Sequence, residues 1–355
     1  MADKDAAIAF ALTKYNSNQG TAINQLRILQ REVIEKVITN HTIAVLPTGY
    51  GQSLCYEILP DVIEYLLKKP AFVIIIVPLN VILSQQKEKM GRRATCLNKE
   101  YYRELTADSA EQTRWTEGQY RYVFAHPEQI VGNDTVIELL LHNYFQEEAT
   151  TFIVVDEAHC VLEWGPDFRP VFAKLGTLRA LLPNAKVLAL SATLSLEGQN
   201  DLAKKLGMTN YASVSMAPPR DNISLIMCKR PTESTIQHAI ECVIEPLLIE
   251  LLVKDKVYHP AESCRGPSEQ STEIVFATIA LGMGADLRHV QRVINIGPPK
   301  RLENYVQQIG RAARSGQQSE AILFYNNSDT DFQLDRDIVE SLDNIVKQVK
   351  AISMS

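Results

Sequence analysis

The sequence predicts an α/β protein built from two units, each with a parallel β-sheet, and three observations lead to this fold class. Short runs of β-branched and apolar residues alternate with helix-like segments of about a dozen residues or more. The runs are continuously apolar rather than alternating, which indicates strands covered on both faces. The chain has 355 residues, enough for about two domains of roughly 150 residues each.

The expected strands fall into two groups along the chain. The first group comprises Thr42–Leu46, Phe72–Val77, Tyr122–Ala125, Phe152–Asp156 and Lys186–Leu190. The second group comprises Ile223–Cys228, Glu273–Thr278, Arg292–Ile296 and Ala321–Tyr325, with a long helical stretch at Ile236–Leu252. Strands that alternate with helices in this way are typical of a parallel α/β sheet.

A boundary between the two units is expected at Ser215–Asn222, which contains two prolines and shows no periodicity. The end of the chain carries an apolar stripe at helical spacing, which predicts an amphipathic helix packed on the second unit. Its members are Ile338, Leu342, Ile345, Val349 and Ile352. We therefore expect a first domain at 1–217, a second and smaller domain at 218–330, and a helical tail at 331–355.

Composition and charge limit the classes of protein that fit. The net charge of −6 gives no overall attraction for nucleic acid, so any such binding must come from a local groove. The six cysteines form no C-x-x-C pair, so no zinc is expected and an intracellular compartment is favoured. The start of the chain is a poor signal peptide, and the longest apolar run is too short to span a bilayer, so no membrane association is expected.

The stretch VLPTGYGQSLCY, which runs from Val45 to Tyr56, has the form of a phosphate-binding loop between a strand and a helix. Glycines at 49 and 51 let the backbone approach a ligand closely, so that amides of the loop can hold phosphate oxygens. The amides expected to do so are those of Thr48, Gly49, Gly51 and Gln52. The hydroxyl of Ser53 is placed to bind Mg²⁺. A glycine-rich turn without a ligand is the alternative interpretation of this stretch alone.

A second stretch, FIVVDEAHC, ends an apolar strand in two carboxylates, Asp156 and Glu157. At a nucleotide site, an Asp at the end of a strand holds Mg²⁺, and the Glu that follows orients or deprotonates the attacking water. The alternative is an exposed acidic turn, but the order of the four residues DEAH favours a nucleotide site.

These stretches resemble the motifs of RecQ-type DNA helicases of helicase superfamily 2, and the likeness runs from about Gln25 to Ser328. The resemblance implies two RecA-like parallel-sheet lobes with ATP and Mg²⁺ between them. It also implies ATP-dependent 3′–5′ unwinding of DNA, with single-stranded or forked DNA as the partner. A nuclear location is expected if the source is eukaryotic, and protein partners are not indicated.

Further motifs of the first unit carry the resemblance. LRILQ, with Arg27 and Gln30, is similar to the adenine-sensing motif, and a Gln amide can pair with the N6 and N7 edge of adenine. His159 and the SAT triplet, Ser191 to Thr193, resemble family residues that couple the nucleotide site to the bound nucleic acid. EWGPDFRP resembles the aromatic-rich loop of the family, in which side chains stack on unpaired bases or contact a phosphate. The residues in question are Trp164, Phe168 and Arg169; filling of the core is the alternative for Trp164.

The second unit resembles the last two motifs of the family. FATIALGMGADLRHVQRVINIGPP contains residues that the resemblance assigns to DNA or nucleotide, namely Thr278, Gly282, Gly284 and Asp286. YVQQIGRAARSG offers Gln307, Arg311 and Arg314. An Arg opposite the γ-phosphate stabilises the transition state and contributes about 10³–10⁵ in rate. A solvated helix end is the alternative for both arginines.

The chain departs from the family in three respects. Gln52 stands where the family has a Lys, so the loop lacks a full positive charge against the β- and γ-phosphates. Between Asn222 and Glu273 no counterpart of the family's fourth motif is found, so the second lobe is expected to be shortened. The zinc-binding, winged-helix and HRDC parts of the family are expected to be absent.

Three functions remain open at this point. The chain is expected to be a RecQ-like helicase core with impaired hydrolysis. It could instead bind ATP and DNA without hydrolysis, or be a decayed helicase fragment that folds only in its first lobe.

Overall fold

The computed structural model describes residues 3–78, 86–163, 175–216, 222–229, 290–299, 302–312 and 317–325. The chain divides into two compact units, residues 1–218 and 219–355. The tail expected at 331–355, the helix expected at Ile236–Leu252 and the strand expected at Glu273–Thr278 lie outside the described residues. Within the described part, no helix is both long enough and apolar enough to cross a bilayer.

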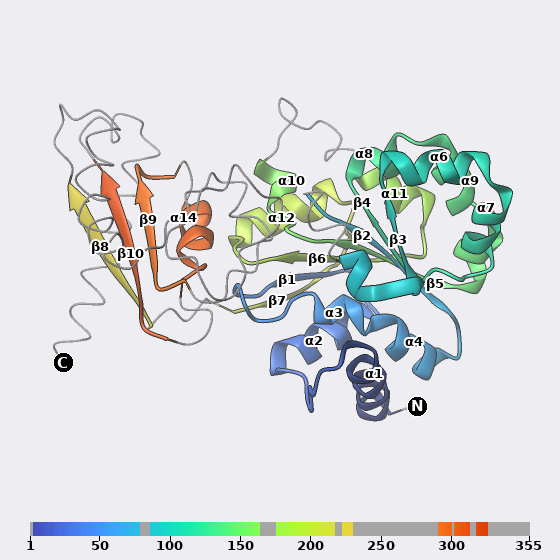
Figure 1. Ribbon diagram of the computed structural model, residues 1–355, viewed down its shortest axis with the longest axis horizontal. Coiled ribbons are helices and arrows are strands. Elements are labelled where there is room, and N and C mark those ends of the chain that lie inside the picture. Colours follow the sequence, from blue (N-terminus) through green and yellow to red (C-terminus); the bar gives the residue numbers. More distant parts are fainter. Residues whose placement is uncertain are drawn as a thin grey trace, which may run out of the picture. The chain divides into compact units, whose positions relative to one another are not determined.

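The first unit contains a sheet of seven parallel strands in the order β3-β4-β2-β5-β6-β1-β7 (Figure 1). Its strands are β1 (Thr42–Val45), β2 (Ala71–Ile76), β3 (Ala94–Leu97), β4 (Tyr122–Ala125), β5 (Thr150–Val155), β6 (Lys186–Ser191) and β7 (Ala212–Ser215). The five strands predicted for this unit are confirmed to within about two residues at each end. β3 and β7 were not predicted, because Thr or Ser residues interrupt their short apolar runs, ATCL and ASVS.

Helices cover both faces of this sheet, with α1–α4 on one face and α10 and α12 on the other (Figure 1). The longer helices are α1 (Lys4–Gln19), α2 (Ile28–Val37), α4 (Leu59–Leu67), α6 (Lys99–Ala107), α7 (Ser109–Thr116), α9 (Asp134–Leu140) and α12 (Leu196–Lys205). The shorter ones are α3 (Leu54–Glu57), η1 (Gly91–Arg93), α8 (Pro127–Val131), η2 (Tyr144–Glu148), α10 (Cys160–Glu163) and α11 (Gly176–Leu181). The continuous burial of β1 and β2 follows from this double cover.

The helix that follows the phosphate-binding loop is shorter than its sequence suggests. α3 ends at Glu57, and α4 begins at Leu59 with Pro60 in its first turn. Pro60 has no N–H to donate to the carbonyl of Tyr56, so one continuous helix cannot run through this point. The break leaves only a single helical turn directly behind the loop.

The second unit contains a smaller parallel sheet in the order β8-β10-β9. Its described elements are β8 (Ile223–Lys229), β9 (Arg292–Ile296), α14 (Leu302–Ile309) and β10 (Ser319–Tyr325). α14 packs on this sheet through the buried side chains of Tyr305 and Ile309, which join Ile223 and Leu323 in a small core. The predicted strands at Ile223–Cys228, Arg292–Ile296 and Ala321–Tyr325 are confirmed, and both units are parallel α/β lobes, as expected.

Candidate functional site

The motif residues of the first unit gather at the carboxyl edge of its sheet. β1 and β5 are both neighbours of β6, with Val45 paired to Ser191 and Val155 paired to Ala189. The loop after β1 and the DEAH turn after β5 therefore leave the sheet at the same edge, roughly 10 Å apart at a strand spacing of about 4.8 Å. This edge is where open parallel sheets bind their ligands.

The loop of residues 46–53 presents unpaired backbone donors. Gly49, at φ 79°, and Gly51, at φ 81°, lie in the left-handed region. Within the part of the chain that the structure describes, the backbone N–H groups of Gly49, Gly51, Gln52 and Ser53 donate no hydrogen bond. Donors in a glycine turn of this kind form a concave anion site. Thr48 lies in the same loop.

Gln30 and Arg27 hold this loop from the start of α2. The amide nitrogen of Gln30 donates to the carbonyls of Tyr50 and Gly51, at 2.9 Å each, and its oxygen accepts from the backbone N–H of Arg27. Arg27 donates to the carbonyl of Gly49 at 3.1 Å and lies over the ring of Tyr50. Both amide hydrogens of Gln30 are thus used within the protein. To pair with adenine as expected, the Gln30 side chain would have to give up one of these hydrogen bonds and form a new one to adenine.

The side chain of Gln52 turns back onto its own loop. Its amide nitrogen donates to the carbonyl of Leu46 at 2.5 Å, and the backbone N–H of Leu46 donates to the carbonyl of Ser191. Gln52 therefore stabilises the start of the loop by a neutral hydrogen bond. It brings no positive charge to the site.

Asp156 and Glu157 form a strongly acidic pair after β5. Burial, followed by the negative charge of Glu157, raises the pKa of Asp156 above its usual range. Glu157 has a left-handed backbone at φ 50°, and the carboxylate of Asp156 accepts a hydrogen bond from its N–H. Two adjacent carboxylates that resist ionisation together are a favourable setting for a divalent cation.

The donor chemistry of this edge fits Mg²⁺. Ser53, at the start of α3, does not use its hydroxyl to cap the helix, and Asp156 supplies a carboxylate. Among the described residues, no group of three or more His, Cys, Asp or Glu side chains is placed to hold a metal ion. One or two protein oxygens completed by phosphates and water suit Mg²⁺, which seldom occupies a cage made by the protein alone.

His159 links the DEAH turn to the SAT triplet. Its Nδ1 lies 3.5 Å from the carboxylate of Glu157 and 3.3 Å from the hydroxyl of Ser191. The hydroxyl of Ser191 in turn donates to the carbonyl of Thr193. All three side chains are buried or half-buried. A continuous set of contacts therefore joins Glu157 to Thr193.

The predicted residues of the second unit are described only in part. Gln307 lies in α14 and Arg311 follows it, and both side chains are buried. The other predicted residues of this unit, Thr278, Gly282, Gly284, Asp286 and Arg314, lie outside the described residues, as do Trp164, Phe168 and Arg169 of the first unit.

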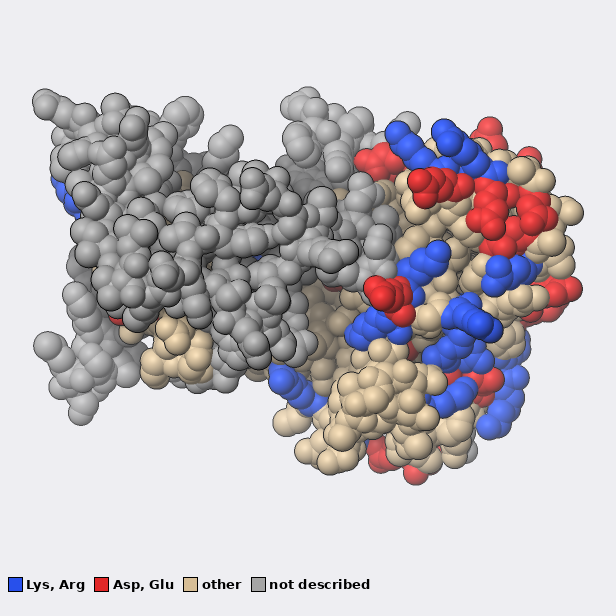
Figure 2. All heavy atoms as spheres, viewed as in Figure 1, with Lys and Arg blue, Asp and Glu red and all other residues tan. Residues whose placement is uncertain are grey.

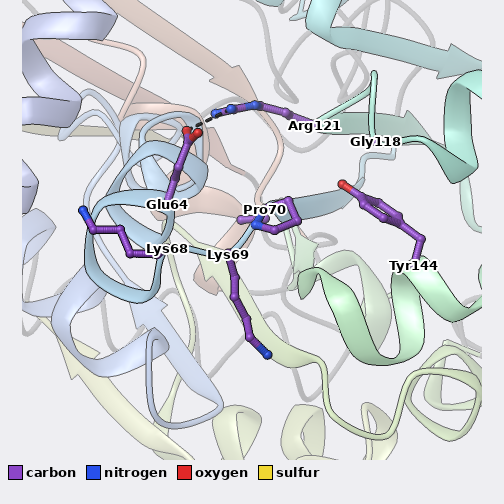
Figure 3. Close-up of a pocket in the computed structure, with 8 residues that line it drawn as sticks. Glu64, Lys68, Lys69, Pro70, Gly118, Arg121 and Tyr144 are labelled. Atoms are coloured by element: carbon purple, nitrogen blue, oxygen red, sulfur yellow. Dashed lines mark ion pairs between the residues drawn. The ribbon is translucent and has the colours of Figure 1, made fainter.

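A cavity of about 390 Å³ lies at the opposite edge of the first sheet, where β2 and β4 begin (Figure 3). Its lining includes Glu64, Lys69, Arg121 and Tyr144, and Arg121 is paired with Glu64 at 2.8 Å. The sequence motifs gave no signal for this cavity, and none of the predicted site residues lines it.

Two known families match this chain. The DEAD/DEAH box helicase family matches residues 27–202, and the helicase conserved C-terminal domain matches residues 261–316. Solved structures similar to the chain include the DEAD-box helicase Mss116 bound to single-stranded RNA, at 18% identity and a TM-score of 0.63, covering 90% of this chain and 73% of that one. Dbp5 of S. cerevisiae bound to RNA is similar at 15% identity and a TM-score of 0.61, covering 99% of this chain and 100% of that one. At these identities the likeness shows the fold alone, which is that of two RecA-like lobes.

Curated relatives are more similar in sequence. The putative ATP-dependent RNA helicase R290 of Acanthamoeba polyphaga mimivirus is 31% identical, over 90% of this chain and 61% of the relative. The ATP-dependent DNA helicase RecQ of Haemophilus influenzae is 28% identical, over 84% and 51%. The probable ATP-dependent DNA helicase RecS of Bacillus subtilis is 30% identical, over 88% and 66%.

The chain thus spans about half to two thirds of the length of these three relatives. Both families match in the order that the motifs predict, and the relatives align over most of the chain. The chain belongs to the RecQ-type helicases of helicase superfamily 2.

Proposed function

We propose that this chain is the core of an ATP-dependent 3′–5′ DNA helicase that binds ATP with Mg²⁺ and single-stranded DNA, and that hydrolyses ATP slowly. Family membership supports the helicase activity. Relatives named as DNA helicases, among them those of Haemophilus influenzae and Bacillus subtilis, favour DNA over RNA as the substrate. The direction of movement rests on the resemblance to the RecQ type.

The observation that carries the nucleotide site is the loop with four unpaired backbone N–H groups next to the acidic pair at one sheet edge. In the proposed site, these N–H groups hold phosphate oxygens while Ser53 and Asp156 hold Mg²⁺. The ion supplies positive charge that neutralises the phosphates. Glu157 orients the attacking water and accepts its proton. His159 and Ser191 couple conformational changes at Glu157 to Thr193.

Gln52 is the reason to expect slow hydrolysis. A Lys in this position adds a cation against the β- and γ-phosphates, whereas the Gln52 amide donates to the carbonyl of Leu46. Losing one well-placed donor to a transition state costs about 10²–10³ in rate, and losing a cation should cost at least as much. The same observation favours a second candidate function, in which the chain binds ATP and DNA without turnover.

Residues of both units carry the remaining proposed roles. Gln307, Arg311 and Arg314 are proposed to stabilise the charge that develops on the γ-phosphate. Gly282, Gly284 and Asp286 are proposed to approach the nucleotide, and Arg27 and Gln30 to set the preference for ATP. The proposed contacts to single-stranded DNA come from Trp164, Phe168, Arg169 and Thr278. These assignments rest on the resemblance of the motifs.

The test compares steady-state ATP hydrolysis by the natural chain and by Gln52→Lys, with and without single-stranded DNA. We expect Gln52→Lys to raise turnover at least 10²-fold, with DNA increasing it further. The matched control adds Glu157→Gln to Gln52→Lys, which should remove the gained turnover and leave nucleotide binding. An unchanged rate in Gln52→Lys, in a chain that binds ATP, would contradict the role given to the loop. Binding of ATP and DNA by the natural chain, with no turnover at all, would favour the second candidate.

A further inference from the structure

Tyr56 is completely buried, and its hydroxyl makes no hydrogen bond of normal length to the described residues, although it lies close enough to Asp156 to offset part of the rise that burial causes in the pKa of that carboxyl. It lies in α3, three residues after Ser53. A buried hydroxyl without a partner destabilises a fold, so an unpaired one next to a binding site suggests that a partner is gained when the ligand binds. The motif analysis gave Tyr56 no role.

Other buried tyrosines of this unit show what is normal for the chain. Four of them donate their hydroxyl to a carboxylate or a carbonyl of the protein at 2.5–2.8 Å, namely Tyr15, Tyr101, Tyr120 and Tyr122, while Tyr144 lines the cavity of Figure 3. The unpaired hydroxyl of Tyr56 is therefore not a general feature of how this fold buries tyrosine.

The sheet places Tyr56 and Asp156 on the same side. Tyr56 belongs to the core cluster that includes Val154 and Leu190, on the face that α1–α4 cover. Side chains alternate between faces along a strand, so Asp156, two residues beyond Val154, points to the face where Tyr56 lies. Consistent with this, burial and then the negative charge of Asp156 raise the pKa of Tyr56.

We propose that Tyr56 is a positioning residue for the Mg²⁺ ligand Asp156, to whose carboxylate its hydroxyl donates a hydrogen bond when Mg²⁺ and nucleotide are bound. This inference rests on the proposed nucleotide site. The bond fixes the orientation of the carboxylate, and such outer partners of metal ligands typically change metal affinity 10- to 100-fold.

The hydroxyl and the ring of Tyr56 have separate roles, which a Phe substitution distinguishes. The ring of Tyr56 fills the core, and Phe preserves it, so Tyr56→Phe should fold with an unchanged or higher melting temperature because it removes an unpaired buried hydroxyl. Tyr122→Phe is the matched control. It also removes one buried hydroxyl, but that hydroxyl donates to the carbonyl of Glu57 at 2.6 Å, so the control should lower the melting temperature.

The experiment titrates MgCl₂ into the full-length chain with a fluorescent, non-hydrolysable ATP analogue, and measures analogue binding without Mg²⁺ in parallel. For Tyr56→Phe we expect the Mg²⁺ midpoint to rise about 10-fold or more, with unchanged affinity in the absence of Mg²⁺. Tyr122→Phe should keep the natural midpoint. An unchanged midpoint in Tyr56→Phe, in a series where the natural chain responds to Mg²⁺, overturns the role of Tyr56 alone. A natural chain that binds no analogue at any Mg²⁺ concentration overturns the proposed site together with this inference.

Discussion

At position 51 the loop favours glycine, for two separate reasons. The backbone of Gly51 lies at φ 81°, where side chains are strained, and a Cβ there would come within 2.7 Å of the amide nitrogen of Gln30. That amide holds the loop through the carbonyls of Tyr50 and Gly51. A side chain at this position would therefore push away the group that shapes the phosphate-binding turn.

We predict that Gly51→Ala weakens binding of an ATP analogue at least 10-fold while the chain stays folded. Gly20→Ala is the control, because Gly20 also has a positive φ, of 64°, but no atom lies within 4 Å of its Cβ position. Both variants carry similar backbone strain, of roughly 1–2 kcal/mol, so their melting temperatures should fall alike. Equal analogue affinity in the two variants, measured by fluorescence anisotropy, would contradict the role given to the Gln30 contact.

Among the helices, α6 and α7 are joined by a buried carboxylate. Glu111 in α7 accepts hydrogen bonds from the hydroxyls of Tyr101 and Tyr120, at 2.5 and 2.6 Å, and pairs with Arg114 at 3.0 Å. Burial alone would raise the pKa of Glu111, but these hydrogen bonds and Arg114 outweigh it, so its pKa is lowered. Trp115 completes the cluster by donating to the hydroxyl of Tyr101.

We predict that Glu111→Gln lowers the free energy of unfolding by about 2 kcal/mol at pH 7, because hydrogen bonds to a charged acceptor are lost. A carboxyl whose pKa is lower when folded stabilises the protein above its unfolded pKa of about 4.3 and loses this effect as pH falls through the folded pKa. The difference in the free energy of unfolding between Glu111→Gln and the natural chain should therefore become smaller below about pH 4. Urea unfolding at several pH values measures this difference. Glu104→Gln, at an exposed position of α6, serves as the control, and an equal loss there would refute the assignment.

For the molecule as a whole, charge gives no general attraction to nucleic acid. The net charge is −6, and on the face shown in Figure 2 the Lys and Arg side chains of the first unit are interspersed with Asp and Glu. The proposed binding to DNA would therefore depend on a limited set of contacts to phosphates, as the sequence already indicated.

We predict that the affinity for single-stranded DNA falls with salt with a logarithmic slope of about −2 or steeper, which corresponds to roughly three phosphates at about 0.7 each. A peptide nucleic acid of the same base sequence has no backbone charge and should show no such slope. Anisotropy titrations between about 50 and 200 mM salt measure both. A flat salt dependence for DNA would show that phosphate contacts do not drive binding.

The sequence predicted the five central strands of the first unit because each is a continuous buried apolar run. It did not predict β7, whose side chains are mostly half-buried or exposed, since an edge strand has a weaker apolar signal. It predicted a helix after the loop, and the structure divides the helical stretch there into α3 and α4. There the absence of an N–H at Pro60 outweighed the apolar pattern on either side.

By itself the sequence determined which chemical groups this protein offers: a glycine turn, a neutral Gln52 in place of a cation, and a carboxylate pair at the end of a strand. These are local properties, fixed by residue identity and by spacing within a few residues. Only the tertiary structure decided which of these groups meet. The contacts of Leu46 with Ser191 and of Ser191 with His159, and the placement of Tyr56 on the face of Asp156, depend on the order and register of β1, β6 and β5. Those properties arise from packing between distant segments, which no local pattern encodes.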